Sequence, residues 1–189
     1  DGPEGRTLWI TGQSPPLVAR WVSLALDLPD TAIRVIAKDV GGAFGLKNHP
    51  WKEESAVIVA ALLLGRPLKW IEDRYEALTA SNQAREAEMT LQAGFDAEGR
   101  LTGSHGIYDC NNGAFPQGAD SNIAVHMFVW AAYKQPAYAF VSRGWYTNTN
   151  GLAAYRGPWA MESLVRETLL DKAARKLGID PVEIRRRNL

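Results

Sequence analysis

The sequence is poor in cysteine and histidine. Cys110 is the only cysteine among 189 residues, so an intrachain disulfide and a four-cysteine iron–sulfur cluster are both excluded. The three histidines, His49, His105 and His126, stand at no spacing typical of metal ligands. We therefore expect the histidines to be structural or surface residues, and we expect no metal held by side chains of this chain.

The sequence also lacks a net charge and a long apolar run. Twenty-one Lys and Arg balance twenty-one Asp and Glu, so no summed charge would attract nucleic acid or an anionic membrane surface. The longest apolar stretch, Ala56 to Leu64, is about half the ~20 residues that a membrane-spanning helix needs. No signal peptide opens the sequence. We expect a cytoplasmic protein with no nucleic-acid partner and no membrane span.

What is present is typical of a globular domain, with 46% hydrophobic and 22% charged residues. The length is typical of one compact domain or of two small packed lobes, and we expect a single domain over residues 1–189. A start without methionine and an end directly after an amphipathic segment indicate a fragment of a longer chain.

Helical and strand patterns are mixed along the chain without strict β-α-β alternation. This predicts an α+β fold with mixed helices and largely antiparallel strands. The expected strands are Arg6–Thr11, Ala32–Asp39, Pro67–Asp73, Met89–Phe95, Leu101–Tyr108 and Tyr138–Tyr146. The expected helices are Ser14–Leu28, Pro50 to Gly65, Trp159–Leu177 and Val182–Arg187, with a long surface loop at Asn111–Asn122.

A glycine-rich segment, GGAFGLK (41–47), directly follows a predicted buried strand. Such glycines let backbone N–H groups approach a phosphate or another acceptor. The segment matches neither the P-loop, which needs Gly-Lys followed by Ser or Thr, nor the G-x-G-x-x-G dinucleotide fingerprint. A ligand-binding loop and a turn required only for backbone shape are both open at this point.

A second segment, AAYRGPWAMES (153–163), places Arg156 beside a glycine and just before a helix. An arginine there can donate a fork of hydrogen bonds to an acidic or carbonyl-rich ligand. A solvated surface arginine or a helix-capping arginine is the alternative.

Taken in order, GGAFGLK, a helix, GRPLKWIEDRYE (65–76), AAYRG and DKAARKLGIDPVEIRRRNL cover essentially the whole chain. This order resembles the molybdenum-binding large subunits of the xanthine dehydrogenase, aldehyde oxidase and aerobic carbon monoxide dehydrogenase family. The resemblance implies the first molybdopterin-binding domain of such a subunit. In that family the cofactor's own dithiolene sulfurs ligate the metal, so the protein supplies hydrogen bonds.

The resemblance also implies a cofactor-binding set. The family's glutamine that approaches the apical ligand of molybdenum falls on Gln13, its backbone contact on Phe44 and Gly45, and its cofactor arginine on Arg156. The full set that we expect is Gln13, Gly42, Phe44, Gly45, Arg156 and Gly157.

Three positions depart from better-known relatives and bear on the substrate. Gly157 stands where copper-containing carbon monoxide dehydrogenases have a cysteine, which argues against copper-dependent CO oxidation. Asn48 replaces the glutamate of purine-type members, and Pro158 replaces their stacking phenylalanine, although Trp159 next to it could substitute. These three residues, Asn48, Pro158 and Trp159, form the expected substrate pocket, and Cys110 is expected to be a buried, inert thiol.

No catalytic residue is expected in this fragment, because the family's glutamate base belongs to a later domain. Glu53 and Glu54 look instead like first-turn helix residues favoured by the helix dipole. The fragment should therefore be inactive alone.

The resulting hypothesis is the cofactor-binding domain of a molybdenum hydroxylase that inserts water-derived oxygen into an aldehyde or N-heterocycle. The cofactor would be molybdenum–molybdopterin, in the cytosine dinucleotide form if the source is bacterial. Partners would be the remaining large-subunit domain, an iron–sulfur subunit with 2Fe–2S clusters, an FAD subunit and a small-molecule substrate. The alternatives are a noncatalytic binding or assembly module, a form II carbon monoxide dehydrogenase-like large subunit, and a phosphate or nucleotide binder built on Gly41 to Gly45.

Overall fold

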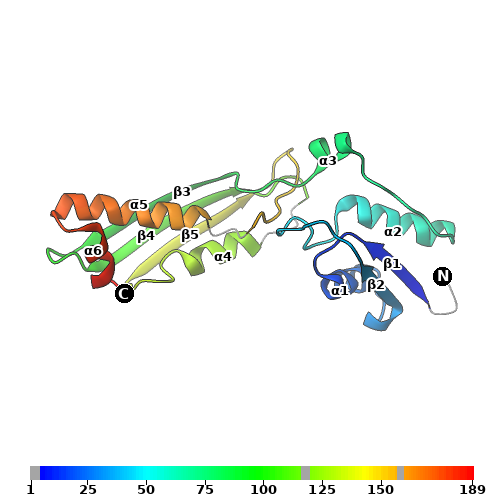
Figure 1. Cartoon of the computed structure of the whole chain (residues 1–189), viewed down its shortest axis with the longest axis horizontal. Coiled ribbons are helices and arrows are strands. Elements are labelled where there is room, and N and C mark those ends of the chain that lie inside the picture. The colour runs from blue at the N-terminus through cyan, green and yellow to red at the C-terminus, as the bar shows by residue number, and fades with distance from the viewer. Residues whose placement is uncertain (1–4, 116–119, 157–159) are drawn as a thin grey trace. The chain divides into compact units, whose positions relative to one another are not determined.

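The computed structural model describes residues 5–115, 120–156 and 160–189, which divide into two compact units (Figure 1). Unit 1 comprises residues 1–83, 115–118 and 150–156. Unit 2 comprises residues 84–114, 119–149 and 157–189. That residues 1–189 act as a single cofactor-binding domain remains a prediction.

Unit 1 begins with two parallel strands joined by a helix. Strand β1 (Arg6–Ile10) pairs with β2 (Ile33–Ala37), and Arg6 lies opposite Ile33. Helix α1 (Pro15–Ala25) connects them, starting with two prolines that suit a first helical turn. Its buried Val18 and Val22 pack with Ile33 to form the core of this unit. This β-α-β arrangement places the end of β2, and the segment after it, beside the start of α1.

Helices α2 (Lys52–Leu64) and α3 (Arg74–Ala80) complete unit 1. Gly65 ends α2 in the left-handed conformation (φ 60°), as predicted. The strand predicted at Pro67–Asp73 is wrong, because this segment has no strand as a partner and leads directly to Asp73, which caps α3. Leu68 and Ile71 are 37% and 71% exposed, so neither has the burial expected of an inward-facing strand residue.

Unit 2 is built on a three-stranded sheet. The predicted hairpin is present, with β3 (Ala87–Phe95) antiparallel to β4 (Leu101–Asn111) and with alternating burial along β3. Strand β5 (Tyr138–Trp145) pairs with β4 in the parallel direction. The α+β class is confirmed, but largely antiparallel strands are not, because β1–β2 and β4–β5 are both parallel.

Three helices belong to this sheet: α4 (Asp120–Phe128), α5 (Ala160–Leu177) and α6 (Pro181–Arg187). Sequence reasoning missed α4, assigning part of it to a surface loop over Asn111–Asn122. Asn112 in that range is buried, and its backbone N–H donates to the Trp145 carbonyl at 2.8 Å. The loop prediction therefore holds for residues 112–115 and is wrong at Asn111, which ends β4, and at residues 120–122, which begin α4; residues 116–119 lie outside the described part.

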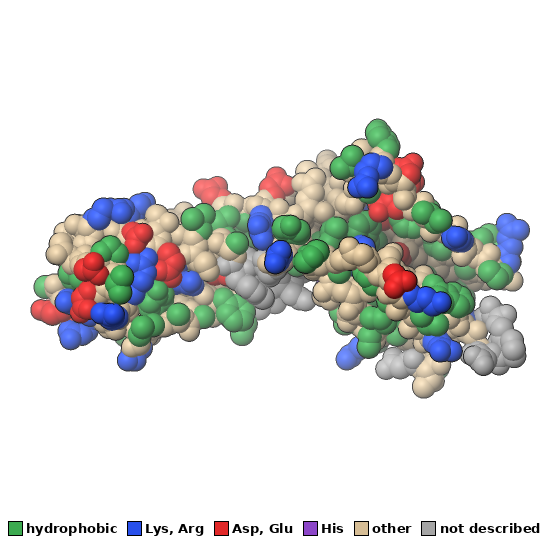
Figure 2. All heavy atoms as spheres, in the orientation of Figure 1, with side chains coloured by type: hydrophobic (Ala, Val, Ile, Leu, Met, Phe, Trp, Pro, Cys, Tyr) green, Lys and Arg blue, Asp and Glu red, His purple; other side chains and the backbone are tan. Residues whose placement is uncertain are grey.

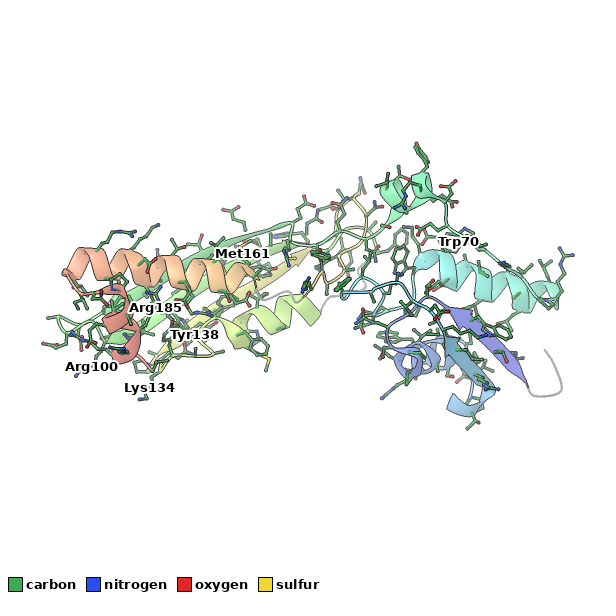
Figure 3. The ribbon with its side chains drawn as sticks, in the orientation of Figure 1. Trp70, Arg100, Lys134, Tyr138, Met161 and Arg185 are labelled. Atoms are coloured by element: carbon green, nitrogen blue, oxygen red, sulfur yellow. The ribbon has the colours of Figure 1, made fainter. Side chains whose placement is uncertain are left out.

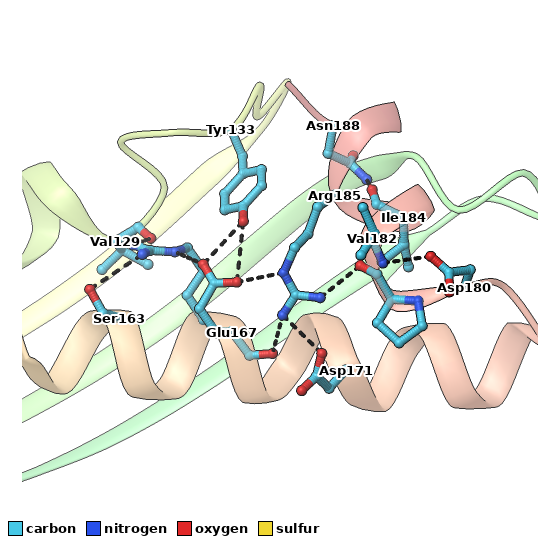
Figure 4. Close-up of polar contacts among 12 residues, drawn as sticks. Val129, Tyr133, Ser163, Glu167, Asp171, Asp180, Val182, Ile184, Arg185 and Asn188 are labelled. Atoms are coloured by element: carbon cyan, nitrogen blue, oxygen red, sulfur yellow. Dashed lines mark hydrogen bonds and ion pairs between the residues drawn. The ribbon is translucent and has the colours of Figure 1, made fainter.

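Helices α5 and α6 are held together by a charged network centred on Arg185 (Figures 3 and 4). Its Nε donates to Glu167 and its Nη2 to Asp171, both at 2.8 Å, while Nη1 donates to the Pro181 carbonyl at 2.7 Å. Arg166 also pairs with Glu167 at 2.8 Å. Figure 2 shows acidic and basic side chains interspersed over this end of unit 2, so its charges are largely matched within the unit.

Three features of the described residues bear on metals and membranes: the environment of Cys110, the grouping of possible metal ligands and the character of the helices. Cys110 is buried and free, and burial raises the pKa of its thiol, which suits the expected inert role. Within the described ranges, no three His, Cys, Asp or Glu side chains group so that they could hold a metal ion. The same part of the chain contains no helix that is both long and apolar enough to cross a membrane.

Candidate functional site

The glycine loop, which we define as residues 41–48, links β2 to α2 and turns sharply. Gly41, Gly42 and Gly45 have φ values of 69°, 107° and 98°, in a region that glycine enters without a steric penalty. Phe44 also has a positive φ, 53°, although it carries a side chain. Such a residue costs on the order of 1–3 kcal/mol and persists only where its surroundings hold it, which is typical of functional sites.

Gln13, directly before α1, holds this loop through two hydrogen bonds. Its side-chain oxygen accepts from the Gly45 N–H at 2.9 Å, and its own backbone N–H donates to the Lys47 carbonyl at 3.0 Å. The oxygen of the amide is thus engaged by the loop. Its NH₂ group donates to no acceptor in the described part of the chain, so the two N–H bonds of an exposed amide are available to a ligand.

Arg156 approaches the same turn from the AAYRG segment. Its backbone N–H donates to the Phe44 carbonyl, and its guanidinium carbon lies 5.5 Å from the centre of the Phe44 ring. Like Phe44, it has a positive φ, 49°. The guanidinium is exposed and meets no carboxylate among the described residues, so its donors are also available.

The close approach of the two segments explains why Gly45 must be glycine. A Cβ on Gly45 would lie 2.8 Å from the Ala154 carbonyl oxygen, closer than real Cβ atoms come to such a group. A Cβ on Gly42 would lie 2.9 Å from the Phe44 ring. Gly42, Phe44 and Gly45 therefore form a tight turn, with Ala154 packed closely against Gly45.

Residues that sequence reasoning did not identify position the AAYRG segment. Gln83 forms an isolated parallel bridge with Leu152, accepting from the Ala153 N–H at 2.8 Å and donating to the Gly151 carbonyl at 2.9 Å. The Asn150 amide donates to the Thr79 carbonyl at 2.8 Å. Nothing in the sequence marks Gln83, because its role depends on its backbone groups.

The predicted substrate pocket is only partly within the described residues. Asn48 is half-buried, its backbone N–H donates to the Gly45 carbonyl at 3.2 Å, and its side-chain amide lies 3.3 Å from the His49 ring. Asn48 therefore ends the glycine loop, and its side chain contacts His49. Gly157, Pro158 and Trp159 lie outside the described residues.

The two glutamates at the start of α2 are first-turn residues, as expected. Glu54 accepts a hydrogen bond from the Trp51 backbone N–H at 3.0 Å, and burial raises the pKa of its carboxyl group. Glu53 pairs with Lys52 at 3.1 Å. Both carboxylates are thus part of the helix start.

The available groups of this site are donors of hydrogen bonds. They are the Gln13 amide and the Arg156 guanidinium, both at the Phe44–Gly45 turn, and no thiolate or imidazole cluster accompanies them in the described residues. Such a set suits a ligand rich in acceptor oxygens that brings its own metal ligands. It does not suit a bare metal ion, which needs carboxylate, imidazole or thiolate groups.

Comparison with known proteins gives the class. The model of the molybdopterin cofactor-binding domain family matches residues 2–189. The chain belongs to this family, which confirms the expected resemblance and the coarse assignment of a molybdenum cofactor.

Three relatives show how closely the chain follows the family. The nicotine 6-hydroxylase large subunit of Paenarthrobacter nicotinovorans is 38% identical, over 96% of this chain and 23% of that subunit. The crystal structure of quinoline 2-oxidoreductase from Pseudomonas putida 86 is 36% identical, with a TM-score of 0.81 over 97% of this chain and 24% of that one. Aldehyde oxidoreductase from Desulfovibrio gigas is 25% identical, with a TM-score of 0.88 over 99% of this chain and 21% of that one. The chain thus spans about a quarter of the length of the relatives that it matches.

Proposed function

We propose that this chain is the part of a molybdenum hydroxylase large subunit that binds the molybdenum–molybdopterin cofactor through Gln13, the glycine loop and Arg156. The observation that carries the proposal is the pair of donor groups, the Gln13 amide and the Arg156 guanidinium, left available at one strained turn. Family membership supports it independently.

When bound, the cofactor supplies the oxidation of a C–H bond with oxygen derived from water. Gln13 would donate its side-chain N–H to an oxygen of the cofactor, because its own oxygen is fixed by the Gly45 N–H. Arg156 would donate a fork of hydrogen bonds to phosphate or carbonyl oxygens. The proposed cofactor-binding set also includes the backbone of Phe44 and Gly45, together with Gly42 and Gly157.

The substrate that we propose is an aldehyde or an N-heterocycle. The names of the relatives support this range, because one acts on nicotine, another on quinoline and a third is an aldehyde oxidoreductase. Gly157, in place of the family's copper-binding cysteine, argues against copper-dependent CO oxidation, and Asn48 argues against a purine. Pro158 and Trp159 complete the proposed substrate pocket.

The remaining components are proposed from the family. They are a further large-subunit domain that holds the catalytic base, an iron–sulfur subunit with 2Fe–2S clusters and an FAD subunit. The cofactor would have the cytosine dinucleotide form if the source is bacterial. The large subunit of the nicotine relative is named as one subunit of a larger enzyme, which supports separate partners. A cytoplasmic location stays a prediction from the sequence.

Metal and pterin analysis of the full-length subunit, purified with its partners, tests the proposal. We expect about one molybdenum and one pterin per large subunit, the pterin identified by fluorescence after oxidation. A folded protein free of both would contradict the proposal and favour the noncatalytic alternative. Tight binding of phosphate or a nucleotide by that metal-free protein would instead favour a phosphate site on the glycine loop.

A further inference from the structure

Trp51 lies between the glycine loop and α2 and contacts both. Its indole N–H donates to the Leu46 carbonyl at 3.0 Å, and the side chain is half-buried. Its backbone N–H donates to Glu54 at 3.0 Å, and its carbonyl accepts from the Ser55 N–H at 2.9 Å. One residue therefore starts the helix with its backbone and binds the loop with its side chain.

The bond to Leu46 acts on the part of the loop that carries the candidate site. Leu46 directly follows Gly45, and its N–H donates to the Ala43 carbonyl at 3.1 Å across the turn that contains Phe44. The next carbonyl, that of Lys47, accepts from the Gln13 backbone N–H. Trp51 and Gln13 thus hold the carbonyls of two consecutive residues, Leu46 and Lys47, which follow Gly45.

An indole ring supplies one donor and no acceptor, so a single hydrogen bond sets how this side chain meets the loop. If it is lost, the Leu46 carbonyl is left without this partner, and the peptide between Leu46 and Lys47 can rotate. That rotation would shift the Gly45 N–H, which orients the Gln13 amide. A small displacement there changes the direction of both groups that the site offers to a ligand.

We propose that Trp51 is a positioning residue for the molybdenum cofactor, acting through the Leu46 carbonyl to hold the Gly45 N–H and the Gln13 amide in place. This role rests on the proposed function. The side chain of Trp51 is not expected to touch the cofactor or the substrate.

The test compares variants of the full-length enzyme with its partners. Trp51→Phe keeps an aromatic ring and removes the donor, whereas Trp51→His keeps a ring N–H. Glu54→Ala loosens the start of α2 and leaves the indole bond intact, which makes it the control for a merely structural effect. The measurements are retention of molybdenum during dialysis, the molybdenum EPR spectrum and hydrogen exchange of the amides in the glycine loop.

We expect Trp51→Phe to lose molybdenum about fivefold faster, with an altered EPR spectrum and faster loop exchange, in keeping with the loss of one hydrogen bond. Trp51→His should recover part of each signal, and Glu54→Ala should leave the EPR spectrum unchanged. A folded Trp51→Phe enzyme that matches the wild type in retention and spectrum overturns this role. If Trp51→Phe does not assemble, Trp51→Leu, which also lacks the donor, takes its place, and wild-type retention and spectrum in that variant overturn the role as well.

The failure of this inference can be separated from that of the proposed function. A wild-type enzyme without molybdenum or pterin overturns the proposed function, and the role of Trp51 with it. A loaded wild type beside an unchanged Trp51→Phe variant overturns the role of Trp51 alone.

Discussion

Arg156 in unit 1 and Arg185 in the last turn of α6 in unit 2 are both arginines, but their surroundings differ. Arg185 has two carboxylates and a carbonyl within 2.8 Å of its guanidinium nitrogens. Arg156 has an aromatic ring on one side and no carboxylate among the described residues. The guanidinium of Arg185 is hydrogen-bonded within the fold, whereas that of Arg156 is left available to a ligand.

The same contrast extends to the rest of the two units. In unit 2 the sheet, α5 and α6 enclose fully buried residues such as Leu170 and Ile184, and the charged side chains form networks. In unit 1 neither α2 nor α3 has a buried residue, and the strained turn is held by hydrogen bonds from distant segments. A fully paired charge indicates a structural role, whereas unpaired hydrogen-bond donors at a strained turn indicate a ligand-binding site.

The largest effect should follow from removing the available donors of unit 1. In the full-length enzyme, Arg156→Ala and Gln13→Ala should each weaken cofactor binding, the arginine variant by roughly 10- to 100-fold, since a hydrogen bond to a charged group contributes about 1.5–3 kcal/mol. Folding should survive, with the free energy of unfolding changed by no more than about 1 kcal/mol, the usual worth of one hydrogen bond such as that between Gln13 and Gly45. Molybdenum content, activity and thermal unfolding measure this, with Arg175→Ala on the exposed side of α5 as the control. Unchanged turnover in both variants would refute the two assignments.

The opposite result is expected for Arg185. Arg185→Ala leaves Glu167 and Asp171 without their shared partner and should destabilise the packing of α5 on α6 by about 2 kcal/mol. Hydrogen exchange of the α5 and α6 amides should become faster, while the molybdenum EPR spectrum stays the same. An altered spectrum with normal exchange would show that the contrast between the two arginines is wrong.

A smaller effect is expected from Glu162 in the first turn of α5, a charged group whose surroundings differ from the paired charges around Arg185. The side chain is fully buried, and neither carboxylate oxygen has a hydrogen-bond partner within the described residues. Burial raises the pKa of this carboxyl group above its usual value. Glu162→Gln should therefore stabilise the protein by about 1 kcal/mol at pH 8.

The direction of this effect follows from how the free energy of unfolding depends on pH. Because the folded pKa is raised, the native state holds the proton more tightly than the unfolded state, whose pKa is about 4.3. The stability of the wild type should fall as pH rises from that value through the folded pKa. The glutamine variant has no titratable group at this position, so its stability should not fall for this reason. Thermal unfolding of both proteins at pH 4 and pH 8 should show a difference only at the higher pH. A destabilised variant at pH 8 would mean that Glu162 is ionised and paired.

Much of unit 2 could be predicted from the sequence, because its signals are local. The alternation from Met89 to Phe95 marks a strand with one buried face, and Asp180 before Pro181 marks the start of α6, where the carboxylate accepts from Val182 and Glu183. The failures concern features that depend on partners. Pro67–Asp73 has strand-like composition but no neighbouring strand, and the parallel pairing of β4 with β5 leaves no trace in either sequence.

The residues of the candidate site were named from the sequence, whereas their geometry was not; that they bind a cofactor stays a prediction. The resemblance named Gln13, Phe44, Gly45 and Arg156, all of which lie in unit 1, where hydrogen bonds and a ring contact connect them. The resemblance did not indicate which hydrogen-bonding groups are engaged within the fold and which are available, because that depends on the backbone conformation at Phe44 and Arg156. Trp51 was missed for a similar reason, since an aromatic residue before an apolar helix usually indicates only core packing.

The bond between the Arg156 N–H and the Phe44 carbonyl has a consequence for the order of events during synthesis. The two residues are far apart in the sequence, and the residues between them include all three strands of the unit 2 sheet, β3, β4 and β5. Closing so long a loop is slow compared with forming a helix or a hairpin. The turn therefore adopts its final conformation only after Arg156 has been synthesised and Leu152 has formed its bridge with Gln83. Cofactor delivery should consequently target an already folded chain and not a nascent one.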